Sequence, residues 1–243
     1  MSRIGLLVPS SNTTVEVEFY RALPKGVTLH VARLFLTQIT PESILGMVQD
    51  LEAQCRNLAS ADVDVIVLGA TAPSFLKGLG YDREIIARIE KATGKRATTT
   101  STALIDALRH LGVSRVVLGS AYDDKVNAIA QSFLEASGLE VVAAQGLSYV
   151  DNLAVGRLDV TSAYDLARKV DRREAEAVVL ACTNWKTMDA IDRLERELGK
   201  PVVTTSQASL WAALRIIGGV EGVPGYGRLL KDLMAPSKQT QLA

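Results

Sequence analysis

The strongest constraint on the fold is an internal repeat, in which several segments recur in the same order. The opening "SRIGLLV" at residue 2 matches "SRVVLGS" at residue 114, and "VIVLGATAPSF" matches "AVVLACTNWKT" at the same offset. Further along, residues 86–112 match residues 191–218. Because chance does not explain several matches in one order, we expect two halves with the same fold.

Each half alternates short aliphatic runs with amphipathic stretches, a pattern that predicts an α/β fold with parallel sheets. We expect two similar lobes, residues 1–112 and 113–235, each a mostly parallel sheet flanked by helices. A pseudo-twofold axis would relate them, with the site between them, and residues 236–243 would form a disordered tail. The expected buried strands are 4–8, 63–68, 116–118 and 177–180. The expected helices are 41–60, 83–93, 102–111, 124–137, 162–170, 188–198 and 208–217.

Charge and cysteine content exclude several classes of function. Lys plus Arg equals Asp plus Glu, 27 against 27, which argues against nucleic acid or an anionic membrane as a partner. No apolar run approaches the length of a bilayer span, and the first strand begins too early for a signal peptide, so we expect a soluble cytoplasmic protein. With only Cys55 and Cys182, neither a disulfide framework nor a metal-ligand cluster is expected.

The repeat pairs Ala70 with Cys182, each at the end of a buried strand, where open α/β sheets bind ligands. A free cysteine is most often a buried structural residue, as we expect for Cys55, but the position of Cys182 favours a function. Backbone N–H groups and a helix N-terminus there would lower the pKa of its thiol. Thr71 and Thr183 follow the pair and suit a carboxylate or oxyanion, although both could simply be turn residues.

Two further loops, "VPSSNTTVE" (8–16) and "SAYDD" (120–124), follow equivalent strands of the two halves. One of Ser10, Ser11 and Asn12 should cap the next helix, and the Asn12 amide also suits a carboxylate. Tyr122 would point into the same cleft and donate a hydrogen bond there, or pack at its rim. The side chains that could line an apolar pocket, or belong to the core, are Phe75, Leu76 and Trp185.

Together, "VPSSNTTVE", "SAYDD", "DNLAVGR", "ACTN" and "PGYGRLL" resemble the aspartate/glutamate racemase superfamily, within it the maleate cis–trans isomerase and arylmalonate decarboxylase branch. The resemblance covers nearly the whole chain. It implies chemistry without a cofactor or metal at a carbon next to a carboxylate, a small carboxylic or dicarboxylic acid as substrate, and a homodimer as a common assembly. The residues expected to bind substrate are Ser10, Asn12, Thr71, Ala72, Tyr122, Asn152 and Thr183.

The two activities of this branch differ at the paired position. Racemases and isomerases of the superfamily place two cysteines on opposite sides of the substrate, whereas this chain has Cys182 and Ala70. Maleate isomerases resemble it at Asn12, Tyr122, Asn152 and Cys182, but the resemblance implies that their nucleophilic cysteine stands where Ala70 is. Arylmalonate decarboxylases also lack that cysteine and keep the other as proton donor.

The resemblance to decarboxylases departs in the first loop, where they have a shorter segment rich in hydroxyls and this chain has Ala72 and Pro73. We therefore expect decarboxylation of a substituted (aryl)malonate-type acid, with an enediolate protonated by Cys182. The alternative is isomerisation or racemisation, with Ala70 a natural or engineered replacement of a catalytic cysteine. A binder of small dicarboxylates without catalysis is the third interpretation.

Overall fold

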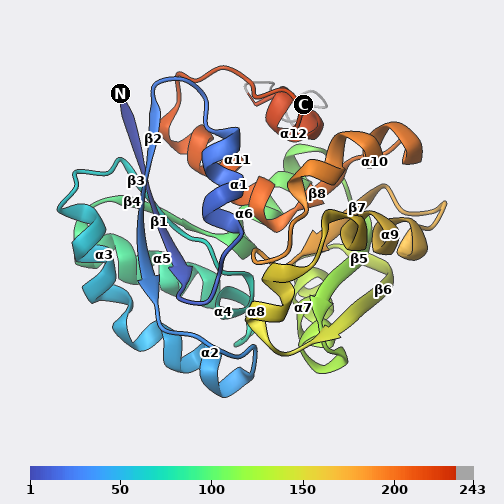
Figure 1. Ribbon diagram of the computed structural model, residues 1–243, viewed down its shortest axis with the longest axis horizontal. Helices are drawn as coiled ribbons and strands as arrows, with labels where there is room; N and C mark the ends of the chain where they lie inside the picture. The colour runs from blue at the N-terminus through green and yellow to red at the C-terminus, as the bar shows by residue number, and fades with distance from the viewer. Residues whose placement is uncertain (234–243) are drawn as a thin grey trace.

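The computed structural model describes residues 1–233 and contains a four-stranded parallel sheet in each half of the chain (Figure 1). The strand order is β2-β1-β3-β4 in the first sheet and β6-β5-β7-β8 in the second, so equivalent strands take equivalent places. The predicted pair of similar α/β lobes is therefore confirmed. The strands are β1 (Ser2–Pro9), β2 (Val27–Leu34), β3 (Val65–Leu68), β4 (Arg96–Thr99), β5 (Arg115–Tyr122), β6 (Glu140–Tyr149), β7 (Ala177–Ala181) and β8 (Val202–Thr204).

Helices cover both sheets, and this explains why the central strands are aliphatic without alternation. Every residue of β3 and β7 is buried, as parallel strands between two helical layers require. Helices α3 and α5 pack on the first sheet, and α7, α9 and α10 pack on the second. The α-helices are α1 (Val15–Ala22), α2 (Pro41–Met47), α3 (Leu51–Ala59), α4 (Thr71–Phe75), α5 (Tyr81–Thr93), α6 (Thr100–His110), α7 (Asp124–Ala136), α8 (Asn152–Arg157), α9 (Val160–Val170), α10 (Ile191–Leu198), α11 (Thr205–Ile217) and α12 (Gly227–Lys231).

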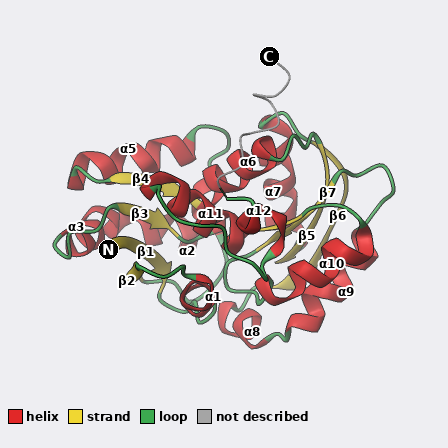
Figure 2. Cartoon of the chain, turned by 90° about the horizontal axis from the view of Figure 1, so that it is seen from above, coloured by secondary structure: helices red, strands yellow, loops and turns green. Residues whose placement is uncertain are grey.

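The equivalent helices α6 and α11 form the seam between the halves. They pack against each other in the middle of the molecule, and each contacts strands of both sheets (Figure 2). The side chain of Thr99 caps α6 and that of Thr204 caps α11, so the two helices begin at Thr100 and Thr205, slightly before the expected residues 102 and 208. The first sheet uses residues 2–99 and the second uses residues 115–204. The division into lobes at residues 112 and 113 stays a prediction.

Three segments differ from the sequence-based expectations. The single helix expected over 41–60 is broken into α2 and α3 by a 3-10 turn, η1 (Val48–Asp50). The loop expected after Ala70 is the short helix α4, and α8 forms where the sequence had no regular pattern, because Asp151 caps its N-terminus by accepting from Leu153 N. The predicted tail over 236–243 lies outside the described residues.

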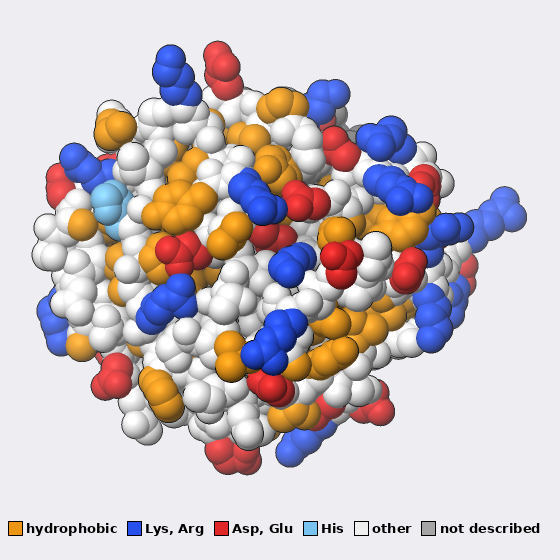
Figure 3. Space-filling view, viewed as in Figure 1, with side chains coloured by type: hydrophobic (Ala, Val, Ile, Leu, Met, Phe, Trp, Pro, Cys, Tyr) orange, Lys and Arg blue, Asp and Glu red, His pale blue; other side chains and the backbone are white. Residues whose placement is uncertain are grey.

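The distribution of charged side chains on the surface (Figure 3) agrees with the equal numbers of basic and acidic residues in the sequence. Over most of the face in Figure 3, basic side chains lie among acidic ones, with a denser group of Lys and Arg at the right edge. In the part of the chain that the structure describes, no helix has the length and apolarity that a membrane crossing requires.

Candidate active site

The carboxyl ends of the central strands of the two sheets meet in one pocket. In the strand order β2-β1-β3-β4, strand β2 lies on one side of β1 and strand β3 lies on the other. The order of the strands therefore reverses at β1, and this reversal opens a crevice at the carboxyl ends of β1 and β3. The second sheet has the same arrangement at β5 and β7. The pocket between these ends encloses about 30 Å³, so in this conformation it is closed to anything larger than a few waters. It is lined by Pro9, Asn12, Leu36, Ile39, Ile44, Ala70, Thr71, Ala72, Pro73, Tyr122, Asn152, Cys182, Thr183 and Asn184.

All but one of the site residues predicted from the sequence line this pocket. The structure brings together Asn12, Ala70, Thr71, Ala72, Tyr122, Asn152, Cys182 and Thr183. Ser10 does not line the pocket, because its side chain is turned to the segment after β2, and its expected role in substrate binding stays a prediction. Its hydroxyl donates to the Leu36 carbonyl (3.2 Å) and accepts from the Leu36 N–H (3.0 Å). Ser10 therefore positions a wall of the pocket without lining it.

Cys182 has an unusual backbone at the end of β7. Its φ is 145°, a region that residues with a Cβ rarely adopt, and its N–H donates to Thr205 Oγ1 at the start of α11 (3.1 Å). The equivalent Ala70 has an ordinary extended φ of −143°. Backbone strain of this kind is concentrated at functional sites, where the surroundings hold it in place. The two halves are thus alike in topology but different in detail at the paired position.

Burial keeps the Cys182 thiol protonated. Only 4% of the residue is exposed, and burial raises the pKa of the thiol to about 11, against the opposing effects of the Asn184 N–H, the Tyr122 hydroxyl and the Trp185 N–H. The expected lowering of this pKa is wrong, because no helix starts directly after Cys182 and desolvation outweighs the nearby donors. The group is therefore a proton donor at neutral pH and a poor source of thiolate.

Tyr122 provides a second neutral acid in the pocket. Burial, and secondly the nearby Cys182, raise the pKa of its phenol well above the ordinary value. The hydroxyl of Thr71 is buried and makes no hydrogen bond of ordinary geometry within residues 1–233, although it lies close enough to Tyr122 to lower the pKa of the phenol. Both hydroxyls can thus donate to an oxyanion bound between the strand ends.

The Asn12 amide is oriented by the helix that it caps. Its Oδ1 accepts from the N–H groups of Thr14 (3.0 Å) and Val15 (3.1 Å) at the start of α1, which confirms the predicted cap. With the oxygen occupied, Nδ2 faces the pocket and lies 3.2 Å from Thr183 Oγ1. The Asn152 Nδ2 donates to Ser11 Oγ at 2.8 Å. Each of these amide groups carries a second N–H besides the one used in the bond named, and that N–H can donate to a carboxylate.

Sequence reasoning missed Asn184, which connects three loops of the pocket. Its Nδ2 donates to the Asn152 carbonyl (2.6 Å), and its Oδ1 accepts from Thr13 N (2.8 Å). Its own carbonyl accepts from Thr14 Oγ1 (2.8 Å). Its position in the sequence could have indicated this role, because Asn184 directly follows Thr183 after a buried strand.

The apolar wall was also missed, since it comes from a segment of the first half outside the matched repeats. Leu36 and Ile39 lie between the end of β2 and α2, Ile44 lies within α2, and all three line the pocket. A bridge between Gln38 and Asp151 and a hydrogen bond from Ile39 N to the Val150 carbonyl (3.0 Å) join this segment to the other half. The alternatives considered from the sequence, Phe75, Leu76 and Trp185, do not line the pocket.

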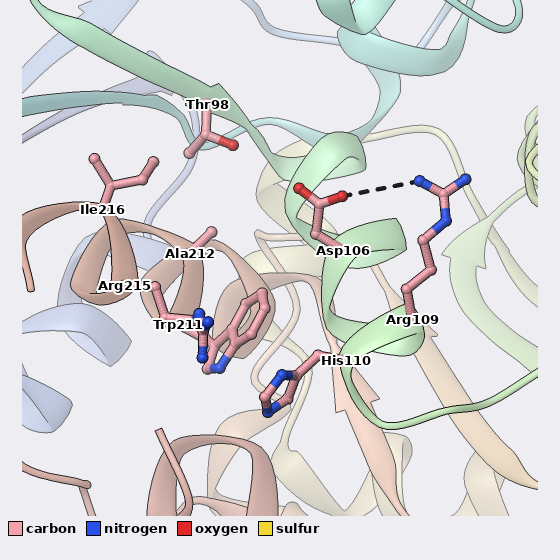
Figure 4. Close-up of a pocket in the computed structure, with 8 residues that line it drawn as sticks. All are labelled: Thr98, Asp106, Arg109, His110, Trp211, Ala212, Arg215 and Ile216. Carbon is pink, nitrogen blue, oxygen red and sulfur yellow. Dashed lines mark ion pairs between the residues drawn. The ribbon is translucent and has the colours of Figure 1, made fainter. Parts of the chain in front are cut away.

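A second hollow, of about 400 Å³, lies between the C-terminal parts of α6 and α11 (Figure 4). It contains none of the predicted site residues, and its charged groups include Asp106 and Arg109, 4.0 Å apart. Although it is larger, it lacks the thiol and the carboxyl ends of the central strands β1, β3, β5 and β7, so it is not the candidate active site. Within residues 1–233, no group of His, Cys, Asp and Glu side chains could hold a metal ion.

Comparison with known proteins matches the chain to two groups of related enzymes, decarboxylases and isomerases. A family model described as arylmalonate decarboxylase matches residues 4–230. The arylmalonate decarboxylase of Bordetella bronchiseptica is 33% identical, with 94% of this chain and 96% of that protein covered. A maleate isomerase of Pseudomonas putida is 31% identical at the same coverage. The solved structure of Nocardia farcinica maleate cis–trans isomerase bound to TRIS superposes with a TM-score of 0.91 at 28% identity, covering 96% of this chain and 98% of that chain.

Proposed function

The chain belongs to the arylmalonate decarboxylase family, and on that premise we propose that it decarboxylates a substituted malonate-type acid, with Cys182 as its single proton donor. Membership confirms the family resemblance found in the sequence motifs. The family's relatives include both decarboxylases and isomerases, so the choice between these reactions depends on the pocket.

One observation carries the proposal: the pocket has a thiol on one side and the methyl group of Ala70 at the equivalent position. Racemisation by two bases needs an acid or base on each face of the substrate carbon. Covalent isomerisation needs a thiolate nucleophile, and the thiol of Cys182 is held protonated by burial. Protonation from one face needs one thiol only, which is what the pocket contains.

The pocket residues support a sequence of steps for this reaction. The donors of Asn12 and Asn152 would hold one carboxylate of the substrate. The other carboxylate would lie against the apolar wall of Leu36, Ile39 and Ile44, where poor solvation favours its loss. When the carbon–carbon bond breaks, carbon dioxide leaves and the electron pair stays behind as an enediolate.

The hydroxyls of Tyr122 and Thr71 are available to stabilise that enediolate. One well-placed donor of this kind contributes about 3 kcal/mol to a transition state. The carbanion carbon then takes the proton from Cys182 Sγ and leaves a thiolate, which recovers a proton from solvent before the next turnover. Because only one face is protonated, a prochiral substrate would give one enantiomer of the product.

A panel of acids followed by proton NMR in deuterated water tests the proposal. With arylmalonates and alkylmalonates, maleate, aspartate and glutamate as substrates, we expect product from malonates alone, with one deuterium at the former malonate carbon. Cys182→Ser should lose most of the activity, whereas Cys55→Ser, a buried thiol outside the pocket, is the matched control. Conversion of maleate to fumarate, full activity of Cys182→Ser, or saturable binding without turnover would each overturn the proposal.

A further inference from the structure

Glu18, on α1, is a buried carboxyl group that holds the segment after Cys182 without lining the pocket. Its Oε1 accepts from the N–H groups of Thr187 (2.8 Å) and Met188 (2.9 Å). Its Oε2 makes no hydrogen bond of ordinary geometry within the described residues, although the Ser206 hydroxyl lies close enough to lower the pKa of the carboxyl. Only 7% of the residue is exposed. A carboxyl group that is buried and half-satisfied in this way is costly to ionise.

The surroundings place the ionisation of this carboxyl in the neutral range. Burial raises the pKa of Glu18 to about 7, while the Met188 N–H, the Ser206 hydroxyl and the Thr187 N–H oppose the rise and Asp189 adds to it. Asp189 is paired with Arg21 at 3.3 Å, so its charge is partly compensated. The charge of Glu18 in turn contributes to raising the pKa of Tyr226 and of Cys182.

Two connections couple Glu18 to Cys182. The carboxyl anchors the far end of the segment 182–188, whose nearer N–H groups, those of Asn184 and Trp185, face the sulfur. Its charge also acts on the thiol through the protein interior and opposes a thiolate. A glutamine could accept the same two N–H bonds, so the hydrogen bonds alone do not require an ionisable group.

We propose that the charge of Glu18 modulates the acidity of Cys182, so that proton delivery to the substrate is faster when Glu18 is neutral than when it is ionised. Glu18 is a positioning residue, because it acts through Cys182 and does not touch the substrate. The inference rests on the proposed decarboxylation for its catalytic meaning. The proton itself still moves from Cys182 Sγ to the substrate carbon, and solvent restores it to the thiolate.

The pH profile of turnover distinguishes this role from a structural one. For the wild type, kcat on a substituted malonate should fall about two- to tenfold as pH rises through about 7, the size expected of one charge acting on another inside a protein. Glu18→Gln should keep the low-pH rate on both sides of pH 7. Asp189→Asn removes a nearby exposed carboxylate and is the control that should retain the fall. A Glu18→Gln profile with the wild-type fall would overturn the proposal.

A measurement without substrate separates this inference from the proposed reaction. In a Cys55→Ala background, the carbon-13 NMR signal of the labelled Cys182 Cβ should show an inflection near pH 7 that Glu18→Gln removes. Ser206→Ala should move that inflection to higher pH, because the hydroxyl lowers the pKa of the carboxyl. If no malonate reacts but the inflection is present and depends on Glu18, the proposed function fails and the coupling stands. A missing inflection, or one that persists in Glu18→Gln, overturns the coupling.

Discussion

The amide nitrogen of Asn12 lies 3.2 Å from the hydroxyl of Thr183, and that hydroxyl donates in turn to the Gly69 carbonyl at 3.1 Å. These two bonds join the ends of β1, β3 and β7, which come from different halves of the chain. The hydroxyl is satisfied as both donor and acceptor, and Thr183 is only 4% exposed. The contact between the halves is therefore part of the pocket itself.

Thr183→Val should damage both stability and turnover. It leaves the Asn12 amide and the Gly69 carbonyl without their partner, at a cost of about 1–3 kcal/mol each for a buried group. Urea unfolding and kcat/KM on a substituted malonate measure the two effects, and we expect a loss of roughly tenfold or more in kcat/KM. Thr28→Val is the control, since its hydroxyl bonds the Ser2 carbonyl (3.4 Å) and His30 Nε2 (3.2 Å) on the half-exposed strand β2, outside the pocket. Equal effects of the two variants would show that the contact between the halves does not hold the site.

Ala70→Cys should end the one-sided protonation. A thiol at residue 70 would face the substrate carbon from the side opposite Cys182, since both positions line the pocket at equivalent strand ends. We expect the product to lose enantiomeric purity, as measured by chiral chromatography, and we expect new conversion of maleate to fumarate by NMR. Ala72→Cys adds a thiol to the same pocket away from the symmetric position and should give neither change. Unaltered product chirality in Ala70→Cys would mean that the two positions do not face one carbon.

The sequence was sufficient for the fold and for most of the pocket because of the repeat. When two halves with the same strand order meet at a pseudo-twofold axis, their equivalent strand ends come together. The sequence alone therefore predicted one pocket that contains Ala70, Thr71, Cys182 and Thr183. The wall formed by Leu36, Ile39 and Ile44 lies outside the matched segments, and its position depends on tertiary contacts such as the bridge between Gln38 and Asp151.

The acidity of the cysteine could not be predicted from the sequence either. Local reasoning counted the N–H donors near Cys182, which do lower the pKa of the thiol, but the degree of burial is a property of the whole fold. The burial of Glu18 could not be predicted for the same reason. In "VEVEFY" it reads as an exposed helical glutamate, and only the packing of α1 against the other half buries it.

Gly156→Ala should disturb the network that holds Asn152. A Cβ at this position of α8 would lie 2.4 Å from Thr13 Oγ1 and 3.2 Å from both side-chain atoms of the Asn184 amide. Because these neighbours are fixed by hydrogen bonds, we expect destabilisation of about 1–3 kcal/mol, measured by urea unfolding, and a raised KM. Gly46→Ala in α2 is the matched control, since nothing lies within 4 Å of its Cβ, and it should stabilise by about 0.5–1 kcal/mol. A neutral effect of Gly156→Ala would show that α8 can shift without cost.

Glu18→Gln should change how stability depends on pH. Burial raises the pKa of this carboxyl in the folded protein to about 7 from an ordinary value of 4.5. Between these values the folded chain holds a proton that the unfolded chain has lost, so the contribution of Glu18 to stability falls as pH rises from about 4.5 to about 7, and the loss is complete above that. The shift corresponds to about 3 kcal/mol.

Glutamine does not titrate, so the variant should gain stability relative to the wild type across this window, as urea unfolding at pH 5 and pH 8 can show. Asp189→Asn, at an exposed position, should keep the shape of the wild-type curve with only a small displacement to lower pH, because Asp189 is the last of the causes that act on the Glu18 pKa. A constant difference between Glu18→Gln and the wild type at both pH values would mean that the carboxyl ionises at its ordinary pH in the folded protein.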